Sequence, residues 1–376
     1  MLNRDLYIYY IENVLLAIYL TVFLIQIYYY LRFYTPVLFL RRKKSKNQLP
    51  LSVVICARNE AQNLQNNLAF IMDQDYPDFE VIVVNDTSTD NTDEVMGEFL
   101  HKYKNLRMTH IPLDRKFSHG KKLALTVGIK AAKNEHIVFT DADCRPESRN
   151  WLNTMQAAYK GKDIVLGYGG YLKKFGLLNN YIRFDTLTIA LQYFGFALAK
   201  KPYMGVGRNL AYKKQLFFDN KGFANHYGIQ SGDDDLFINE VATSKNTGVQ
   251  ISKDSFTRSV PKNSWGDFFN QKLRHLSTSG NYKSKHIFML GLEPLSRAWF
   301  YTLFILLWYM KSYEFIVVAL AGIRLVLQII VYSFAGIRFK ERNLMLTCTI
   351  FDVYSLFFNF VAYLALSIRS RKIRWK

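Results

Sequence analysis

The chain has 376 residues, which is too long for one compact α/β unit of the usual size and too short for three. Lysine and arginine outnumber aspartate and glutamate by 49 to 30, a balance that suits nucleic acid, an anionic membrane surface or a phosphate-bearing substrate. Many basic residues follow the first and last apolar runs, which is the positive-inside pattern of a membrane protein and excludes a DNA-binding stripe. We therefore expect the bilayer, and no nucleic acid, as a partner. These basic residues are Arg32, Arg41, Arg42, Lys43, Lys44, Lys46, Arg369, Arg371, Lys372, Arg374 and Lys376.

Residues Ile11–Tyr30 form an apolar run long enough to cross a bilayer, for which about 20 residues are required. We expect a membrane helix rather than a cleaved signal peptide, because the basic cluster follows the run and no small-residue cleavage site is evident. The basic side should be cytoplasmic, so residues 1–48 form an anchor whose N-terminus lies outside. The three cysteines show neither disulfide nor zinc spacing, which agrees with a reducing cytosolic compartment.

From Leu49 the composition becomes that of a soluble α/β domain, which we expect to cover residues 49–279. Its alternating strands and helices predict a mostly parallel sheet with helices on both faces and ligands at the carboxyl ends of the strands. The predicted strands are Leu51–Cys56, Phe79–Val84, Leu106–Ile111, Glu135–Thr140 and Ile164–Gly170. The predicted helices are Asn59–Met72, Thr92–Tyr103, Gly120–Ala132, a buried or membrane-surface helix at Asn180–Ala199, and Phe268–Ser277.

Two carboxylates, Asp141 and Asp143, follow the fourth of these strands and are separated by one residue. Residues two apart in an extended chain point to the same side, so the two carboxylates can converge. They would repel each other unless a cation lay between them, and Mg²⁺ or Mn²⁺ takes such oxygen ligands while leaving positions for substrate phosphates. A solvated turn is the simpler interpretation of an isolated Asp-x-Asp. Polar residues at the ends of other strands, Cys56–Glu60 and Asn85–Asp86, favour a site instead.

Residues 280–376 return to the bilayer, with apolar segments at about 295–310, 315–334 and 344–368. The first two resemble a helical hairpin. A third span would place the basic C-terminus outside, against the positive-inside rule, so we expect residues 344–368 to re-enter around Asp352 or to lie partly in the interface. Arg324, in the middle of the second segment, should face protein or a cavity rather than lipid.

Six motifs occur in one order along the chain, and a set of six is far more specific than any one of them. They are Ser52–Glu60, Val83–Asp90, His119–Lys121, Thr140–Asp143, Ser231–Leu236 and Gln271–Arg274. Together they resemble the family 2 glycosyltransferases of the GT-A fold over about residues 51–277. The flanking apolar segments are similar to those of membrane-embedded members, such as ceramide glucosyltransferases, hyaluronan and cellulose synthases, and polyprenyl-phosphate sugar transferases.

The resemblance implies a donor-nucleotide site at the strand ends, which includes Ala57. Asp86 would accept a hydrogen bond from uracil, and Glu60 would hold ribose hydroxyls. Lys121 starts a helix, where backbone donors and an ammonium group suit phosphate. Structural roles compete with each of these assignments: a helix N-cap for Asp86, a helix N-terminal charge for Glu60 and a solvated side chain for Lys121.

The resemblance also assigns the acidic residues. Asp143 would bind the metal, and Asp141 would contact the sugar or ribose. Three adjacent carboxylates raise one another's pKa, which suits a general base near neutral pH, and the resemblance places that base at Asp234. Its neighbours Asp233 and Asp235 are further candidates, although an acidic helix N-terminus explains both of them.

Gln271, Arg274 and His275 resemble the Gln-x-x-Arg-Trp motif of membrane-bound synthases, with histidine in place of tryptophan. Arg274 would clamp the leaving diphosphate. The replacement by His275 weakens the case for a stacking role at the acceptor entrance and hence for processive synthesis. Residues Gly205–Asn209 are too short for a dinucleotide fingerprint, but the resemblance places a Gly/Asn-rich loop here beside donor sugar and acceptor, which makes Asn209 a candidate.

These observations predict an inverting glycosyltransferase that uses a nucleotide-diphosphate sugar, UDP-linked by the resemblance, and a divalent metal, Mg²⁺ or Mn²⁺. The acceptor hydroxyl would belong to a lipid or a lipid-linked glycan at the cytoplasmic face of the cell membrane, because short tethers at both ends hold the catalytic domain against the bilayer. A processive exopolysaccharide synthase is the alternative within this class. A non-catalytic membrane protein that binds nucleotide sugars or acts as a scaffold is the alternative outside it.

Overall fold

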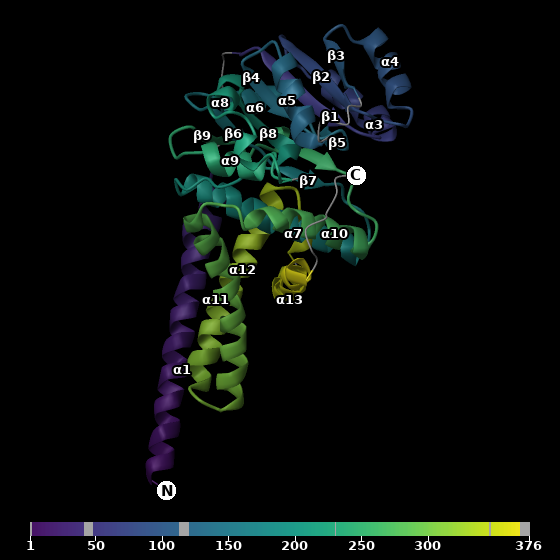
Figure 1. Cartoon of the computed structure of the whole chain (residues 1–376). Helices are drawn as coiled ribbons and strands as arrows, with labels where there is room; N and C mark the ends of the chain where they lie inside the picture. The colour runs from purple at the N-terminus through teal and green to yellow at the C-terminus, as the bar shows by residue number, and fades with distance from the viewer. Residues whose placement is uncertain (1, 41–47, 113–119, 230, 346, 369–376) are drawn as a thin grey trace.

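The structure is a computed structural model that describes residues 2–40, 48–112, 120–229, 231–345 and 347–368. Most of the basic residues that follow the first and last apolar runs, together with His119, lie outside these ranges. Figure 1 shows an α/β domain standing on a group of long helices, with two helices lying between the two parts.

Seven strands form the main sheet in the order β3-β2-β1-β4-β8-β6-β9. Strands β1 to β4 are parallel, β8 runs antiparallel to β4 and β6, and β9 is parallel to β6. The mostly parallel sheet predicted from the sequence is therefore confirmed. The strands are β1 Leu51–Ala57, β2 Phe79–Asp86, β3 Leu106–Ile111, β4 His136–Phe139, β6 Ile164–Leu166, β8 Leu210–Lys213 and β9 Thr247–Val249.

Helices cover both faces of this sheet, because its strands are apolar on both sides. Alternate residues such as Val53 and Val54 belong to separate cores, the first packed against α3, α4 and α6 and the second against α5 and α7. The packing of α5 is close, since a Cβ atom on Gly128 would lie 2.5 Å from Val54 Cγ1. These helices are α3 Ala61–Met72, α4 Thr92–Lys102, α5 Lys121–Ala131, α6 Trp151–Ala157 and α7 Leu177–Leu198.

A second sheet of three strands has the order β5-β10-β7 and lies at the edge of the domain that faces the long helices. It corrects one prediction: the single strand expected at Ile164–Gly170 is two strands, β6 and β7, in different sheets. The chain leaves the first sheet at Gly167, whose N–H bonds to Asn209 O at 3.0 Å. The strands are β5 Cys144–Pro146, β7 Gly169–Tyr171 and β10 Thr257–Ser259.

The remaining elements of the domain are short, except for α10. They are α8 Lys214–Asp219, α9 Asp235–Val241, α10 Trp265–Ser279, and the 3₁₀ turns η2 Gly207–Asn209, η3 Ala224–His226 and η4 Lys253–Ser255. Helices α7 and α10 lie between the domain and the long helices. Most of α7 is buried, as the sequence predicts, and its Asp185 is paired with Lys272 of α10 at 2.6 Å.

The long helices are α1 Leu2–Tyr29, continued by the π-helix η1 Tyr30–Tyr34 and by α2 Thr35–Leu38, then α11 Ser284–Tyr309, α12 Glu314–Arg338, the 3₁₀ turn η5 Arg342–Leu344 and α13 Cys348–Ile368. Within the described residues, three helical stretches are long and apolar enough to cross a membrane: Leu6–Leu38, Glu314–Arg338 and Cys348–Ile368. Helix α11, which contains the predicted span at 295–310, does not meet this criterion of length and composition.

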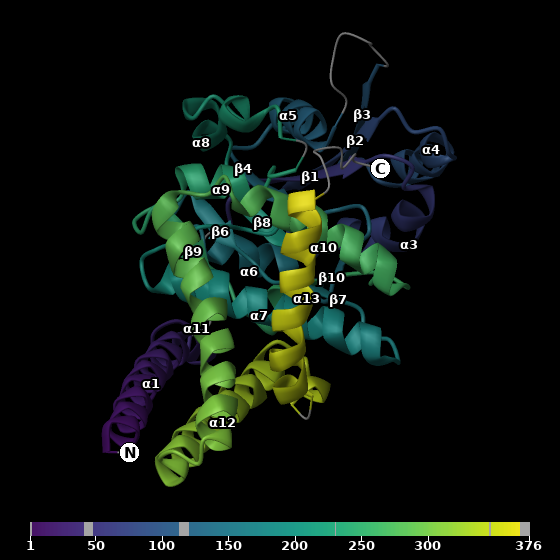
Figure 2. The same cartoon turned by 60° about the horizontal axis from the view of Figure 1, so that its bottom comes forward.

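Helix α13 lies across the other long helices rather than beside them. Figure 1 shows α1, α11 and α12 lengthwise and α13 end-on beneath α7 and α10, whereas Figure 2 shows α13 lengthwise in front of α7. Its aromatic residues pack on α7, where Tyr181 contacts Phe351, Tyr354 and Phe358 with ring centroids 4.9–5.4 Å apart. Whether this segment lies in the membrane interface or re-enters the bilayer stays a prediction.

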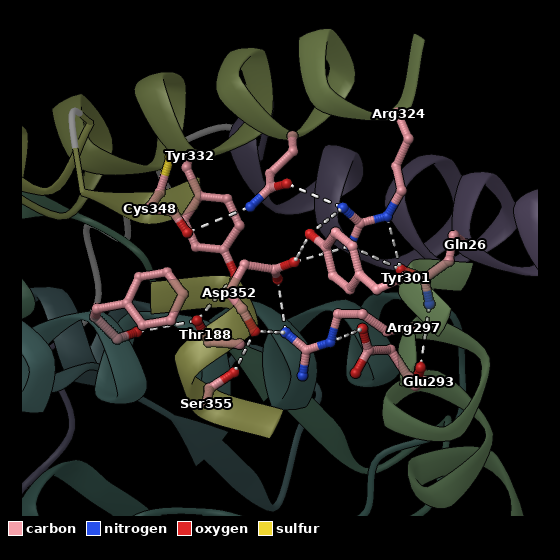
Figure 3. Close-up of polar contacts among 12 residues, drawn as sticks. Gln26, Thr188, Glu293, Arg297, Tyr301, Arg324, Tyr332, Cys348, Asp352 and Ser355 are labelled. Carbon is pink, nitrogen blue, oxygen red and sulfur yellow. Dashed lines mark hydrogen bonds and ion pairs between the residues drawn. The ribbon is translucent and has the colours of Figure 1, made fainter. Parts of the chain in front are cut away.

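Arg324 is buried among the long helices, as expected, and does not face outward (Figure 3). Its guanidinium group bonds to Gln26 Oε1 at 3.1 Å and to Tyr301 Oη at 2.9 Å. It also bonds to Gln328 Oε1 at 3.1 Å and to Asp352 Oδ2 at 3.0 Å. One arginine thereby joins side chains from α1, α11, α12 and α13, which is how an intramembrane charge is normally satisfied.

A second buried charge cluster joins the domain to the long helices. Glu341, just after α12, pairs with Arg183 of α7 and with Arg258 of β10. Arg258 also bonds to Glu147 Oε1 at 2.6 Å. Glu341 is almost fully buried, so it is the common counter-ion of two arginines that have little access to water.

We predict that Glu341→Ala strongly destabilises the protein. Removing one member of a buried ion pair costs about 3–5 kcal/mol, because the remaining charge is left uncompensated. The matched control is Lys340→Ala, which removes an exposed partner of Glu147 and should cost at most about 1 kcal/mol. Thermal unfolding in detergent should show a large fall in Tm for Glu341→Ala alone. Equal Tm values for the two variants would contradict a central role for Glu341.

Candidate active site

The carboxyl ends of β1, β2 and β4 meet at one edge of the main sheet, as the sequence predicts. Ala57 ends β1 and lies beside Asn85 of β2 in the parallel register. Asp86, the last residue of β2, is fully buried, and Arg58 Nη1 lies 4.0 Å from its Oδ2. Glu60 stands at the start of α3, and burial raises the pKa of its carboxyl group although Asn63 donates a hydrogen bond to it.

Asp141 and Asp143 converge, although not for the reason expected. The chain turns after β4 instead of staying extended, and Cys144 N–H closes the turn on Asp141 O at 3.0 Å. A carboxylate oxygen from each aspartate and Cys144 Sγ all lie within 4.8 Å of one another. Ser259 of β10 donates a hydrogen bond to Asp143 Oδ2 at 2.6 Å, so the second sheet fixes the orientation of this carboxylate.

The charges of this pair are set by their neighbours. Burial and the adjacent Asp141 raise the pKa of Asp143. Burial would also raise the pKa of Asp141, but Lys121 outweighs it and lowers that pKa, so Asp141 stays ionised. Burial raises the pKa of the Cys144 thiol well above its usual range, which keeps it protonated. The pair therefore offers oxygen ligands, which suits a hard cation such as Mg²⁺ or Mn²⁺.

Lys121, at the start of α5, joins the two acidic clusters. Its Nζ lies 2.8 Å from Asp141 Oδ1 and 3.2 Å from Asp233 Oδ2. Burial would lower the pKa of Lys121, but these carboxylates outweigh burial and raise it well above its ordinary value. The side chain is thus a permanent cation between carboxylates rather than the solvated lysine of the alternative interpretation.

Asp234 is held at the N-terminus of α9 by two backbone bonds. Gly207 N–H donates to its Oδ2 at 2.6 Å, and Asp235 N–H donates to its Oδ1 at 2.8 Å. Burial, followed by the charges of Asp233 and Asp235, raises the pKa of Asp234 to about 7. A carboxyl group with this pKa is half ionised near neutral pH, which is suited to taking a proton from a hydroxyl group.

Helix α10 brings Gln271, Arg274 and His275 to the same site. Gln271 Nε2 donates to Tyr171 Oη at 3.0 Å, while its Oε1 is buried without a hydrogen-bond partner in the described chain. Arg274 and His275 line the cavity described below, on the side opposite the sheet. The C-terminal motif and the strand-end motifs therefore meet, as expected.

Two predicted residues are taken up by structural contacts. Asn209 is fully buried and does not line the cavity: its amide bonds to Tyr168 O at 2.9 Å, Ser255 O at 2.6 Å and Trp151 Nε1 at 3.1 Å. This corrects its assignment beside the donor sugar, because every polar atom of the side chain braces the core. Asp235 accepts hydrogen bonds from Thr278 and Tyr282, which ties α9 to α10.

Arg208 is a site residue that the sequence alone does not indicate. Its guanidinium carbon lies 4.2 Å from the centroid of the Tyr171 ring, and its Nη1 is buried without a hydrogen-bond partner in the described chain. The side chain lines the same cavity as Asp141 and Asp143. Its only sequence signal is an arginine in a glycine-containing turn, Gly205–Asn209, which has no specific chemistry until Tyr171 is placed beside it.

One cavity of about 1110 Å³ connects most of these groups, but Ala57, Asp86 and Asn209 do not line it. At one end it is lined by Glu60, Lys121, Asp143 and Asp234, and it continues between α7 and α10 to the long helices. There it is lined by one face of α11 and one face of α13. Its residues on α11 include Leu295, Ala298, Thr302 and Ile305, and those on α13 include Val353, Leu356, Phe357 and Phe360.

Comparisons with known proteins agree with this geometry. Residues 52–217 match the family Glycosyl transferase family 2. The poly-beta-1,6-N-acetyl-D-glucosamine synthase of Staphylococcus epidermidis is 34% identical over 93 residues, which are 25% of this chain and 21% of that protein. Glycosyltransferase AglE of Haloferax volcanii is 32% identical over 118 residues, 31% of this chain and 37% of that protein. The chain thus matches well under half the length of these relatives.

The fold is similar over a larger part of the chain to a solved structure, the mannosyltransferase PcManGT from Pyrobaculum calidifontis in complex with GDP-Man and Mn²⁺. The TM-score is 0.58 at 18% sequence identity, over 92% of this chain and 99% of that one. The fold is therefore of the GT-A class. More particularly, residues 52–217 match a family 2 glycosyltransferase domain, in which the first four of the six motifs lie.

We predict that Asp143→Ala weakens Mn²⁺ binding by at least about tenfold, because a carboxylate is a dominant ligand for a hard cation. The fold should persist, since Asp143 lies in a turn that lines the cavity. Isothermal titration of the purified full chain with Mn²⁺ tests this without any sugar donor. Asp163→Ala, which removes a surface partner of Lys213, is the control and should bind Mn²⁺ as the wild type does. Unchanged affinity in Asp143→Ala would refute the assignment.

Proposed function

We propose that the chain is an inverting glycosyltransferase that moves a sugar from a nucleotide-diphosphate sugar, a UDP-sugar by the family resemblance, to a hydroxyl group of a lipid or lipid-linked acceptor. The observation that carries this proposal is the single cavity that joins the acidic site to the faces of α11 and α13. Leu295, Ile305, Phe357 and Phe360 line the cavity and are all exposed, so its far end is lined by accessible apolar side chains. Such a lining suits a lipid.

The donor would lie at the strand ends. Asp86 and Glu60 would contact the nucleoside, and the diphosphate would lie near Arg274 and Lys121, whose positive charges oppose its own. A divalent metal held by Asp141 and Asp143, when bound, would neutralise the diphosphate leaving group. Mn²⁺ accompanies GDP-Man in the similar mannosyltransferase structure, which supports a metal of this kind here.

Asp234 would act as the general base. It takes the proton of the acceptor hydroxyl while the oxygen attacks the anomeric carbon, and the bond from that carbon to the diphosphate oxygen breaks on the opposite side. A single displacement with one base and no covalent intermediate inverts the anomeric configuration. A hydroxyl acceptor explains why a base is present at all, because a phosphate acceptor is already ionised and would be repelled by Asp233 and Asp234.

The long helices support a topology in which the catalytic domain is cytoplasmic. With α1, α11 and α12 as the crossings, an N-terminus outside puts the domain inside, and the chain returns inside at Arg338. If α13 lies in the plane of the inner interface, the basic C-terminal residues also stay inside, which satisfies the positive-inside rule. Glu293 and Arg297 make α11 less apolar than a typical span, but both are buried against other helices.

The processive synthase remains the alternative function, because a poly-N-acetylglucosamine synthase is among the relatives. Two observations favour the lipid acceptor instead. His275 replaces the motif's tryptophan, and the far end of the cavity is lined by apolar side chains of α11 and α13. A growing polysaccharide would need a polar path.

We predict that Asp234→Asn lowers the rate of transfer by about 10²–10⁴, since it removes the general base while keeping the shape of the side chain. In the wild type, activity should fall as the pH is lowered through about 7, because protonated Asp234 cannot accept a proton. The residual activity of Asp234→Asn should lack this acid limb. Rates measured between pH 5.5 and 8.5 test both statements. A benign Asp234→Asn beside a severe Asp233→Asn would move the base to Asp233.

We predict that Ala298→Trp, which fills the cavity beside α13, abolishes transfer to lipid while nucleotide binding is kept. The matched control is Ala319→Trp, the same change on the exposed surface of α12, which should leave transfer intact. Incorporation of label from a panel of radiolabelled UDP-sugars into a lipid extract and into polymer distinguishes the two candidate functions. Full lipid labelling by Ala298→Trp, or label in polymer alone, would contradict the lipid-acceptor route.

A further inference from the structure

The half of the cavity that faces the long helices contains charged side chains as well as apolar ones. Among the charged residues that line the cavity are Asp185 and Lys272, from α7 and α10, and Glu293 and Arg297, from α11. All four are at least nine-tenths buried. Asp185 is paired with Lys272 at 2.6 Å, and Glu293 is paired with Arg297 at 3.4 Å. The two negative and two positive charges of these ion pairs balance one another.

Arg297 is only partly used by these contacts. Its Nη1 donates to Asp352 Oδ1 at 2.6 Å, and its Nε forms the 3.4 Å ion pair with Glu293 Oε1 without hydrogen-bond geometry. Figure 3 shows the remaining guanidinium nitrogen pointing away from Asp352 and Arg324, with no contact drawn to it. Arg324, by contrast, has every nitrogen bonded and lies behind Arg297, outside the cavity lining.

Glu293 and Arg297 therefore present an acceptor and a donor side by side to the interior of the cavity. A hydroxyl or amide group can donate to the carboxylate and accept from the guanidinium, so both members of the pair gain a partner. A lipid phosphate is an anion at neutral pH, and its oxygens are mainly acceptors. It would face the Glu293 carboxylate among ion pairs that are already balanced, where an unpaired charge is costly.

We propose that Glu293 and Arg297 form a subsite for the uncharged polar group of a neutral lipid acceptor, one that carries hydroxyl or amide groups, and that they disfavour phosphate-bearing lipids. This inference rests on the proposed function and names the class of its acceptor. The lipid chains would lie along the apolar faces of α11 and α13, while the hydroxyl that receives the sugar reaches Asp234.

In the proposed subsite both cations are paired with carboxylates, which is why it would select a neutral polar group over a phosphate. Lys272 could otherwise serve as a phosphate ligand, but Asp185 holds it at 2.6 Å. Arg297 could do the same, but it is shared between Glu293 and Asp352. Removing one carboxylate from either pair would leave one positive charge unbalanced and should favour an anionic head group.

The test compares two lipids that differ only in a phosphate, dioleoylglycerol and dioleoylphosphatidate, in competition for the full chain in detergent, with bound lipid measured by native mass spectrometry. The wild type should retain dioleoylglycerol over phosphatidate by at least about tenfold. Glu293→Gln should shift this ratio at least about tenfold toward phosphatidate. Asp185→Asn is an independent second variant with the same expected direction. Glu314→Gln, the same substitution at the exposed start of α12, is the control and should behave as the wild type.

Binding of UDP, and of GDP as a second nucleotide, is measured on every variant to separate the possible failures. A wild type that binds neither nucleotide contradicts the proposed function itself. A wild type that binds nucleotide but prefers phosphatidate, or retains neither lipid, overturns the neutral-lipid subsite alone. Unchanged lipid ratios in variants that still bind nucleotide overturn it as well. If both variants lose nucleotide binding, the lipid preference of the wild type decides the question.

Discussion

The position of Lys121 between two acidic clusters is the interaction on which the active site depends. Asp141 reaches the site from the end of β4 and Asp233 from the start of α9, and both contact the same ammonium group. Without that cation, five carboxylates from residues 141–143 and 233–235 would repel one another in a partly buried space. With it, Asp141 stays ionised while Asp234, one residue further along, keeps a pKa of about 7. Lys121 thus lies beside one carboxyl group with a lowered pKa, Asp141, and near another with a raised pKa, Asp234.

A second constraint is the position of the domain relative to the long helices. This position must be fixed, because one cavity is lined by both parts. Glu341 supplies this by pairing with Arg183 of α7 and Arg258 of the second sheet. The N-terminal helix adds a close packing contact. A Cβ atom on Gly195 would lie 2.2 Å from Phe33 O, so α7 and η1 can approach this closely only because residue 195 is glycine. Phe33 and Phe196 stack beside it with ring centroids 4.3 Å apart. These ion pairs and packing contacts together fix the position of α7 between the domain and the long helices.

Much of the catalytic domain follows from the sequence, because local patterns determine it. Strands β1, β2 and β4 are buried on both faces, so apolar runs identify them, and their polar ends meet at one edge. The division of residues 164–170 between two sheets does not follow from the sequence, because it depends on contacts with distant residues such as Asn209. The same holds for Arg208, whose environment is supplied by Tyr171, 37 positions before it in the chain.

The orientation of α13 could not be predicted from hydropathy, and the reason is physical. Residues 348–368 are long and apolar enough for a span, and composition alone cannot distinguish a helix that crosses a bilayer from one that lies along it. The distinction lies in the partners of a few residues. Asp352 is fixed by Arg297 and Arg324 at one end of the helix, and the aromatic residues after it pack on α7 and α10. Those contacts hold the helix beneath the domain and leave its opposite, apolar face exposed.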